Sequence, residues 1–539
     1  MRGLMMDFPL TVAALVERAG GIFGEVEIVT RRPDRRLARS TWGDLYRRSR
    51  RLANALTGLG LRRGDRVATL LWNQTEHMEA YFGVPVAGGV LHTLNLRLHP
   101  DELAFIADHA GDRFLIVDDV LFHVYEKIRD RVKFERVIVV PFGGGEAPKG
   151  CDGYEDLLSA ASEDFTYPQL DENEAAAMCY TSGTTGRSKG VVYSHRAIVL
   201  HSMNCCGVDS FGISMRDTVL PATSLFHANG WGIPFTAALA GAKVVLPGPF
   251  ADGEGLLDLI ERERVTFTTG VPTVWFGALE ALEKFPGRWK FTWPIRMHLG
   301  GAATSGALMR GFDRHGITVI CSWGMTETTP VASSSHLRPH MESWSDDKKH
   351  EQRLKPGIPA SLLEARIIRH DGTEAPRDGS SVGEIEVRGP WVAAAYYNMP
   401  EEAQKWSPDG WLRTGDMGHI DEHGYMKLVD RSKDLIKSGG EWISSVDLEN
   451  ALMGHPAVKE AAVIGVAHPK WQERPLAVVV LNEGAKAAPA ELREFLAAKF
   501  AKWQLPDAFV FAAEIPRTSV GKFRKVDLRE QFVDWKWET

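Results

Sequence analysis

The amino-acid sequence predicts an α/β protein made of two mainly parallel α/β subdomains, a small β-barrel and a small α+β C-terminal domain. Three observations lead to this fold class. Helical stretches alternate with short apolar runs from about residue 40 to 140, and again up to residue 321, as in helices packed on parallel sheets. After residue 355 the segments become short and β-rich, and beyond residue 430 helices and strands mix. A chain of 539 residues has room for several such units.

The first alternating region begins with a helical stretch, WGDLYRRSRRLANALTGLG, and continues with expected strands at 66–71, 113–117 and 136–140. A loop rich in glycine, proline and charge, PFGGGEAPKGCDG, separates it from the second region. There the expected strands are 219–220, 243–246, 265–269 and 317–321, spaced by helical stretches such as GLLDLIERE and PTVWFGALEALEKF. Strands joined through helices predict largely parallel sheets.

The pattern of predicted helices and strands changes after about residue 355. The segments LLEARIIRHDGTEAP, GEIEVRGPWVAAAYY and GHIDEHGYMKLVD carry turn residues between strands and predict antiparallel hairpins in a small barrel or sheet. Beyond Asp430, helices in SSVDLENALMGH and PAELREFLAAKF and strands in KEAAVIGVA and PLAVVVLN predict a compact α+β unit. Near the N-terminus, Glu17 and Arg18 interrupt an apolar stretch, which favours a short amphipathic helix over a secretory signal.

Composition excludes several classes of protein. With 44% hydrophobic and 25% charged residues, the chain has the composition of a globular protein. Its formal net charge of -7 provides no basic surplus, so no nucleic-acid partner is expected. No run of about 18 uncharged apolar residues occurs, so no transmembrane segment is expected, whereas peripheral membrane contact stays open. The five cysteines have no C-x-x-C pair or zinc-like spacing, which favours a reducing cytoplasm.

One loop has the composition of a phosphate-binding segment. The stretch from Tyr180 to Gly190, YTSGTTGRSKG, combines hydroxyl side chains, glycines and a lysine after a short apolar run. Glycines let backbone N–H groups converge on phosphate oxygens, hydroxyls donate hydrogen bonds, and the cations offset the phosphate charge. The loop does not match the G-x-x-x-x-G-K-[ST] pattern. A glycine- and serine-rich loop without a ligand is the alternative.

Seven motifs occur in a fixed order: YTSGTTGRSKG, FHANGW, GGAAT, WGMTE, RTGD, DRSKDLIKSGGEW and PRTSVGKFRK. Together they resemble the adenylate-forming superfamily of acyl-CoA synthetases, adenylation domains and luciferases, and the resemblance covers nearly the whole chain. The segments VVYSHRAIVLHS, KVVLPGP, GVPTVW, GGEWISSVDLENALMGHP and HPKWQERPLAVVV look most similar to bacterial medium- and long-chain fatty-acid CoA ligases and methylmercaptopropionate CoA ligases.

The resemblance implies a domain organisation. It predicts an N-terminal adenylate-forming domain at 1–429, whose β-rich subdomain spans about 355–429, a hinge at 430–435 and a C-terminal domain at 436–539 that rotates between two half-reactions. Lys433 falls on the hinge position, and Gly439 and Gly440 would line a channel for coenzyme A. The implied substrates and cofactors are a carboxylic acid, ATP, Mg²⁺ and coenzyme A. The fatty-acid ligases that it resembles also predict a homodimer.

The resemblance further implies the roles of single residues. The implied ATP- and AMP-binding residues are Thr181, Ser182, Gly183, Thr184, Thr185, Gly186, Lys189, Gly301, Ala302, Trp323, Gly324, Met325, Thr326, Asp416, Arg431, Lys437 and Trp442. The implied acyl pocket contains His227, Trp231, Val271, Gly300 and Gly301. The implied metal contacts are Glu327 and Thr181, and the implied catalytic residues are Lys522, Glu327 and His227.

Side-chain chemistry is consistent with three of these roles. Mg²⁺ prefers oxygen ligands and bridges phosphates with few protein carboxylates, which suits Glu327. The Asp416 carboxylate can accept hydrogen bonds from both ribose hydroxyls. A cation at Lys522 would offset the repulsion between a carboxylate and the α-phosphate and stabilise charge on the phosphorus oxygens.

Structural explanations remain open for other positions. A tryptophan such as Trp323 is more often a core residue than a ring that stacks on adenine. A histidine near Phe and Trp, as at His227, is usually packed in the core. A tight turn would explain Gly301 as well as close approach to a ligand does, and a simple glycine-rich turn would explain Gly439 and Gly440.

Four alternatives remain for the whole protein. The same chemistry could act on an aryl, short-chain or methylthio acid, since sequence does not show the length of the acyl tunnel. No acidic residue in FHANGW or GVPTVW suggests binding of an amino group, which disfavours an amino-acid substrate. An adenylation domain that serves a carrier protein is less expected, because no carrier segment follows the Lys522 motif in this sequence. A luciferase-like oxygenase would have to oxidise its adenylate. A silent acyl or nucleotide sensor should have lost residues such as Glu327 or Lys522, which are both present.

Overall fold

The N-terminal part of the chain forms a seven-stranded sheet. The structure is a computed structural model that describes residues 1, 3–181, 187–431, 433–438, 441–518 and 522–537. The strand order is β7-β6-β5-β3-β4-β8-β9, parallel throughout except for the last pair. The strands are β3 (Arg66–Leu70), β4 (Val90–Thr93), β5 (Asp112–Asp118), β6 (Arg136–Val140), β7 (Asp152–Gly153), β8 (Ala175–Tyr180) and β9 (Gly190–Ser194). The predicted phosphate loop therefore joins two antiparallel strands at an edge of this sheet.

A nine-stranded sheet forms the second α/β unit, in the order β16-β15-β14-β13-β12-β10-β11-β1-β2. The six strands from β14 to β1 are parallel, and β2, β15 and β16 are antiparallel. The strands are β1 (Glu27–Arg31), β2 (Leu37–Thr41), β10 (Thr218–Pro221), β11 (Lys243–Leu246), β12 (Phe267–Gly270), β13 (Ile295–Leu299), β14 (Ile317–Gly324), β15 (Val331–Ser334) and β16 (Ile358–Pro359). The prediction of two mainly parallel sheets is confirmed.

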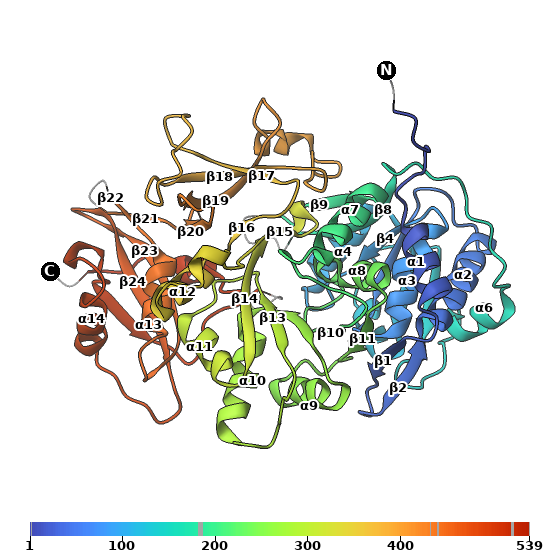
Figure 1. The fold of residues 1–539 in the computed structure, drawn as a ribbon, viewed down its shortest axis with the longest axis horizontal. Helices are drawn as coiled ribbons and strands as arrows, with labels where there is room; N and C mark the ends of the chain where they lie inside the picture. The colour runs from blue at the N-terminus through green and yellow to red at the C-terminus, as the bar shows by residue number, and fades with distance from the viewer. Residues whose placement is uncertain (2, 182–186, 432, 439–440, 519–521, 538–539) are drawn as a thin grey trace.

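Helices form three layers around these two sheets (Figure 1). One buried cluster contains α1, α2, α3, α7 and α8 together with residues of both sheets, so these helices lie between the sheets. A second cluster packs α9, α10 and α11 on the other face of the nine-stranded sheet, and a third packs α4 on the seven-stranded sheet. The helices are α1 (Val12–Ile22), α2 (Trp42–Gly58), α3 (Thr75–Val86), α4 (Pro100–Ala110), α5 (Phe122–Glu126), α6 (Tyr154–Ala160), α7 (His195–Cys206), α8 (Ile233–Ala240), α9 (Gly253–Glu263), α10 (Pro272–Lys284) and α11 (Gly306–Arg314).

Local sequence explains where several of these helices begin. Thr41 and Asp44 form a reciprocal capping box at the start of α2, which satisfies backbone N–H groups that have no partner within the helix. The side chains of Ser194, Asp252 and Ser305 accept hydrogen bonds in the same way at α7, α9 and α11. The amphipathic helix predicted near the N-terminus is α1.

The β-rich region forms a four-stranded antiparallel sheet in the order β17-β18-β19-β20. Its strands are β17 (Glu364–Ile368), β18 (Gly383–Arg388), β19 (Leu412–Ile420) and β20 (Met426–Arg431), and α12 (Asp346–Arg353) precedes them. The sequence predicted a small barrel or sheet at this place. In the described residues the four strands form a sheet and not a closed barrel, since β17 and β20 are its two edges and do not pair with each other.

The C-terminal unit has a sheet of its own at the left end of Figure 1. The strands β22-β21-β24-β23 follow one another, and β25 pairs in parallel with β24. The elements are β21 (Ile436–Ser438), β22 (Glu441–Ile443), α13 (Ser445–Leu452), β23 (Val458–His468), β24 (Gln472–Leu481), α14 (Pro489–Ala497), β25 (Ala508–Phe511) and α15 (Lys525–Gln531). Within the described part of the chain, every helix is too short or too polar to cross a membrane.

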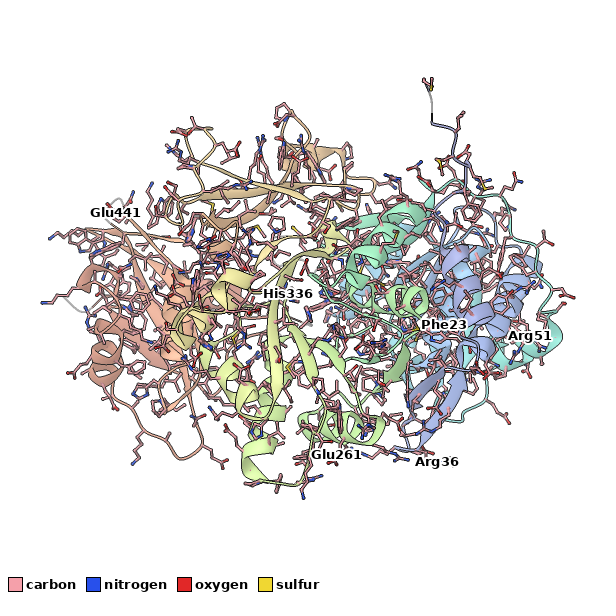
Figure 2. The ribbon with its side chains drawn as sticks, viewed as in Figure 1. Phe23, Arg36, Arg51, Glu261, His336 and Glu441 are labelled. Carbon is pink, nitrogen blue, oxygen red and sulfur yellow. The ribbon has the colours of Figure 1, made fainter. Side chains whose placement is uncertain are left out.

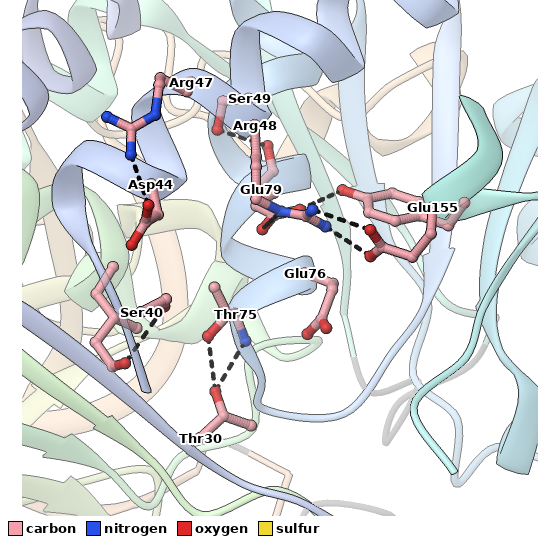
Figure 3. A network of polar contacts seen from close by, with 12 residues as sticks. Thr30, Ser40, Asp44, Arg47, Arg48, Ser49, Thr75, Glu76, Glu79 and Glu155 are labelled. Atoms are coloured by element: carbon pink, nitrogen blue, oxygen red, sulfur yellow. Dashed lines mark hydrogen bonds and ion pairs between the residues drawn. The ribbon is translucent and has the colours of Figure 1, made fainter. Parts of the chain in front are cut away.

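A buried carboxylate ties three helices of the N-terminal unit together (Figure 3). Glu79 of α3 has a side chain only 1% exposed and accepts from Arg48 Nε of α2 at 2.6 Å and from the Tyr154 hydroxyl of α6 at 2.7 Å. Arg48 also pairs with Glu155, which is 48% exposed. Burial raises the pKa of Glu79, and the Arg48 charge opposes this rise. Arg48 is thus the cation that compensates a buried charge.

We expect Arg48→Met to destabilise the protein by about 3 kcal/mol, because it leaves Glu79 buried without its cation. Glu155→Gln, which removes only the exposed partner, should change stability by less than about 0.5 kcal/mol. Urea unfolding followed by tryptophan fluorescence compares the two variants. Equal effects of both substitutions would contradict this account.

Candidate active site

A cavity of about 340 Å³ opens where the two large sheets, the four-stranded sheet and the C-terminal unit meet. Val271 follows β12, Gly300 and Gly301 follow β13, and Trp323 lies at the end of β14. Because these strands are parallel neighbours, their carboxyl ends meet at one edge, where open α/β sheets bind ligands. The four-stranded sheet adds residues around β19 and β20, and the C-terminal unit adds Lys522.

Most of the site residues that were predicted from the sequence line this cavity. Those lining it are Thr181, Lys189, His227, Trp231, Val271, Gly300, Gly301, Trp323, Gly324, Met325, Thr326, Glu327, Arg431, Lys433 and Lys522. Ser182, Gly183, Thr184, Thr185, Gly186, Gly439 and Gly440 lie outside the described residues.

Four predicted nucleotide-binding residues are not in the lining. Asp416 lies directly behind it and contacts Trp323. Ala302 is exposed beside the cavity. Lys437 and Trp442 face each other across the β21–β22 pair, at the outer end of the molecule where Figure 2 labels Glu441. Trp442 is 53% exposed there, so in this arrangement of the units neither side chain reaches the cavity.

The wall that carries Trp231 has a left-handed backbone. Residues 228–232 all have positive φ, with values of 37° at Ala228, 36° at Asn229 and 56° at Trp231. Such angles cost a non-glycine residue about 1–3 kcal/mol each and persist only where the surroundings fix them. Asn229 Nδ2 donates to Thr93 Oγ1 at 3.1 Å, and a Cβ on Gly232 would lie 2.7 Å from the His201 ring. The contacts with Thr93 and His201 therefore help to fix the backbone conformation of this wall.

Gly300 and Gly301 form the floor beneath Trp231. A Cβ on Gly300 would lie 2.8 Å from the Ser322 carbonyl oxygen and 3.1 Å from the indole. A Cβ on Gly301, whose φ is +78°, would lie 3.3 Å from Val271 and 3.7 Å from Lys522 Cε. Steric crowding therefore favours glycine at both positions, and at Gly301 the positive φ favours glycine as well.

Glu327 is a nearly buried carboxylate at one side of the cavity. It lies in a 3₁₀ turn, Thr326–Thr328, is 4% exposed, and accepts a hydrogen bond from the Tyr396 hydroxyl. Burial and the Glu327 charge raise the pKa of Tyr396, so its hydroxyl stays a donor at neutral pH. Nearby, Lys189 Nζ pairs with Glu402 at 2.7 Å and lies 5.2 Å from the centre of the Tyr396 ring.

Lys522 enters the cavity from the C-terminal unit. Its backbone exchanges two hydrogen bonds with Thr518, at 2.7 and 3.1 Å, which fix the base of its loop. Burial, and then the Arg431 charge, lower the pKa of Lys522 to about 8. Burial and Lys522 lower the pKa of His227 to about 3, so this imidazole is neutral at pH 7. The cavity thus holds a lysine cation beside a neutral histidine.

Asp416 connects two residues of the lining. Trp323 Nε1 donates to Asp416 Oδ2 at 2.8 Å, and Arg431 Nε lies 3.3 Å from Asp416 Oδ1. Trp323 is 7% exposed and packs in the core of the four-stranded sheet while one side lines the cavity. Because each carboxylate oxygen can accept two hydrogen bonds, Asp416 retains acceptor capacity beside the indole.

Sequence reasoning missed eight residues of the lining: Ala228, Ser322, Pro330, Val331, Tyr396, Lys405, Thr414 and Gly415. Most are neighbours of recognised motifs, since Thr414 and Gly415 belong to RTGD and Pro330 follows WGMTE closely. Tyr396 and Lys405 carry no such signal, because they come from a segment between β18 and β19 that only the fold brings to Glu327.

The described residues offer few protein ligands for a metal ion. Across these residues, no group of three or more His, Cys, Asp and Glu side chains could hold a metal ion. Glu327 and Thr181 line the cavity and present oxygen atoms. Such a donor set fits Mg²⁺, which takes one or two carboxylates and completes its coordination with phosphate and water.

Comparison with known proteins agrees with this geometry. The family model for AMP-binding enzymes matches residues 24–397, and that for the AMP-binding enzyme C-terminal domain matches residues 447–522. A long-chain-fatty-acid–CoA ligase of Thermus thermophilus is 48% identical over 533 residues, covering 98% of this chain and 97% of the relative. A 3-methylmercaptopropionyl-CoA ligase of Ruegeria lacuscaerulensis is 41% identical, with 99% of each chain covered.

Solved structures show the same architecture. The crystal structure of the anthranilate CoA ligase AuaEII in complex with anthranoyl-AMP has a TM-score of 0.86 and 25% identity, covering 97% of this chain and 98% of that one. The chain therefore belongs to the AMP-binding enzyme family.

We expect Gly301→Val to weaken AMP binding at least about tenfold, because the added side chain would fill the space between Val271 and Lys522. Gly316→Val is the matched control, since Gly316 has a similar φ of +73° with no atom within 4 Å of an added Cβ. Both variants should lose about 1–2 kcal/mol of stability to backbone strain. Calorimetric titration with AMP separates them, and equal AMP affinities would refute the expectation that AMP binds against Gly301.

Proposed function

We propose that this protein is an ATP-dependent acyl-CoA synthetase. It would convert a carboxylic acid, ATP and coenzyme A into acyl-CoA, AMP and pyrophosphate through an acyl-adenylate. The main support is one observation: a lysine from the C-terminal unit lies in the same cavity as a nearly buried carboxylate and a floor of two glycines. The presence of both Lys522 and Glu327 in that cavity argues against a silent sensor.

In the first half-reaction, the substrate carboxylate attacks the α-phosphate and pyrophosphate leaves. Lys522 would place its cation between these two anions, which offsets their repulsion and stabilises charge on the phosphorus oxygens. A nearly buried cation interacts more strongly than an exposed one because little water screens it. His227, which is neutral at pH 7, would border the reacting carboxylate without adding a second charge.

The nucleotide would be held by groups on three sides. Thr181 and Lys189 would contact phosphates, with the glycines and hydroxyls at 182–186 completing the loop. Asp416 would accept from the ribose hydroxyls, and Trp323 and Gly301 would face the adenine. Glu327 and Thr181 would hold Mg²⁺, which when bound supplies charge that offsets the leaving pyrophosphate. Tyr396 supports this role because its hydrogen bond fixes the orientation of the Glu327 carboxylate.

The second half-reaction requires a different arrangement of the units. Attack of the coenzyme A thiolate on the acyl-adenylate carbonyl forms the thioester and releases AMP. We propose a domain of residues 1–429, a hinge at 430–435 with Lys433 as its pivot, and a mobile domain of residues 436–539. Rotation would withdraw Lys522 and bring the β21–β22 pair toward the cavity, with Gly439 and Gly440 along the coenzyme A path.

Medium- to long-chain fatty acids are the proposed substrates. Trp231, Val271 and Val331 contribute apolar surface to the lining of the cavity. The identity of 48% with a long-chain ligase supports this choice. 3-Methylmercaptopropionate is the second candidate, because a ligase named for that acid is 41% identical over the whole chain. We also propose a homodimer, which rests on the resemblance to fatty-acid ligases alone. We propose a reducing cytoplasm as its location, for which the free state of all five cysteines is the supporting observation.

The test is formation of AMP and acyl-CoA from straight-chain acids of about 4–18 carbons, with ATP, Mg²⁺ and coenzyme A. Aryl and methylthio acids serve as competitors. An optimum at about eight carbons or more supports the fatty-acid assignment. A preference for the methylthio acid would keep the mechanism and replace the substrate, and absence of pyrophosphate release with every acid would refute the enzyme assignment.

We expect Lys522→Ala to lower the rate of adenylate formation about 10²–10³-fold, because one preorganised electrostatic donor is lost. Thioester formation from supplied acyl-adenylate should be largely spared, since Lys522 would have left the cavity by then. Pyrophosphate release and thioester formation are measured separately. Equal loss of both half-reactions would contradict the role given to Lys522.

The rate of adenylation should also fall at alkaline pH. Lys522 carries its charge below its pKa of about 8, so kcat/KM for pyrophosphate release should be highest below pH 8 and fall above it. Lys522→Arg keeps its charge throughout this range and should lose the alkaline fall even if its rate is lower. The profiles are recorded without coenzyme A, whose thiol ionises in the same range. An identical alkaline fall in both enzymes would assign it to another group.

A further inference from the structure

A buried group of polar side chains joins the four-stranded sheet to the C-terminal unit. Asp430 lies in β20, opposite Met417 of β19, and is 4% exposed. Its Oδ2 accepts from the Ser445 backbone N–H at 2.7 Å and from the Ser445 hydroxyl at 2.5 Å. Ser445 is the first residue of α13 and is fully buried. This contact therefore connects Asp430, which precedes the proposed pivot Lys433, to the C-terminal unit that follows it.

Lys525 extends the contact into the C-terminal unit. Its Nζ lies 2.5 Å from the Ser445 hydroxyl and 2.6 Å from Glu449 Oε1, and the Lys525 and Glu449 side chains are only 10% and 9% exposed. Glu449 Oε1 also accepts from the Val463 backbone N–H of β23 at 2.7 Å. Burial opposes the Lys525 charge, but the carboxylates of Glu449 and Asp430 outweigh it and raise the pKa of Lys525.

The helix that contains Lys525, α15, follows Lys522 closely in the chain. Lys525 begins α15 only three residues after Lys522, and the Arg524 backbone N–H donates to the Pro516 carbonyl at 2.8 Å, so the loop and the helix share a base. One turn further along α15, Arg529 pairs with Asp434. The helix that follows Lys522 thus contacts Asp434 directly and is linked to Asp430 through the Ser445 hydroxyl.

We propose that Lys525 and Ser445 are positioning residues for adenylation, because with Asp430 they form a latch that stabilises the arrangement in which Lys522 enters the cavity. This inference rests on the proposed function. If the C-terminal unit rotates about Lys433, Asp430 stays with β19 while Ser445, Glu449 and Lys525 move together. The Asp430 contacts then break, whereas the Lys525–Glu449 pair survives. The latch therefore favours only one of the two arrangements.

Ser445→Ala is the most direct test, because it removes the hydroxyl shared by Asp430 and Lys525 and leaves the Lys525–Glu449 pair in place. We expect adenylation, measured as pyrophosphate release, to slow about tenfold. Thioester formation from supplied acyl-adenylate should be unchanged or faster. Asp430→Asn should act in the same direction, Lys525→Met more strongly, and Lys525→Arg should recover part of the loss.

Asp507→Asn is the control. Asp507 pairs with Arg474 and Arg493 within the C-terminal unit, so the substitution perturbs a comparable ion pair that does not cross the hinge. Both half-reactions should keep their rates in this variant. A loss of adenylation in Asp507→Asn equal to that in Ser445→Ala would overturn the latch, because it would show general sensitivity of the unit to lost polar contacts.

A second measurement does not depend on activity. Trypsin should cleave at Lys433 or Lys437 several-fold faster in Ser445→Ala and Asp430→Asn than in wild type or Asp507→Asn, because an open latch exposes the linker more often. Unchanged cleavage together with equal loss of both half-reactions would overturn the inference. If wild type released no pyrophosphate while the variants still opened the linker, the proposed function would fail and the latch would stand.

Discussion

The cavity depends on holding a lysine cation in a place with little water. Burial and the neighbouring Arg431 disfavour the Lys522 charge, while Asp416 and Glu327 favour it. Arg431 lies on β20, Asp416 on β19 and Glu327 in a turn after β14, whereas Lys522 comes from the C-terminal unit. Three separate parts of the fold, β19, the turn after β14 and the C-terminal unit, must therefore come together before the charge is tolerated in spite of its burial. The electrostatic balance makes the site a property of the assembled units rather than of any one of them.

Much of the fold followed from local sequence patterns, because alternating helices and apolar strands predict parallel sheets wherever they occur. The order of the strands within each sheet could not be predicted from these local patterns. β1 and β2 join a sheet whose other strands begin at Thr218, and β1 pairs with β11 across more than two hundred residues. Periodicity cannot reveal such a pairing. The choice between a barrel and a sheet after residue 355 could not be made from sequence for a related reason: hairpin signals specify neighbouring strands but say nothing about whether the two edge strands meet.

The candidate site was predicted where residues sit in ordered motifs and missed where only the fold brings them in. Glu327 and Lys522 were named from motifs and share one cavity, whereas Tyr396, which orients the Glu327 carboxylate, lies in a stretch with no such signal. Lys437 and Trp442 face away from the cavity in this arrangement. A sequence motif carries no information about which arrangement of two units it serves, so their predicted contact with the nucleotide stays a prediction.

The left-handed turn at 228–232 restricts which residues can occupy the cavity wall that carries Trp231. Side chains branched at Cβ, such as valine, isoleucine and threonine, are poorly tolerated at positive φ, so position 231 disfavours them even where they would fit the cavity. Replacement of Trp231 is therefore restricted mainly to residues unbranched at Cβ, and glycine is the residue that this backbone itself favours. The left-handed backbone thus filters which substitutions survive at this wall before any substrate selects among them.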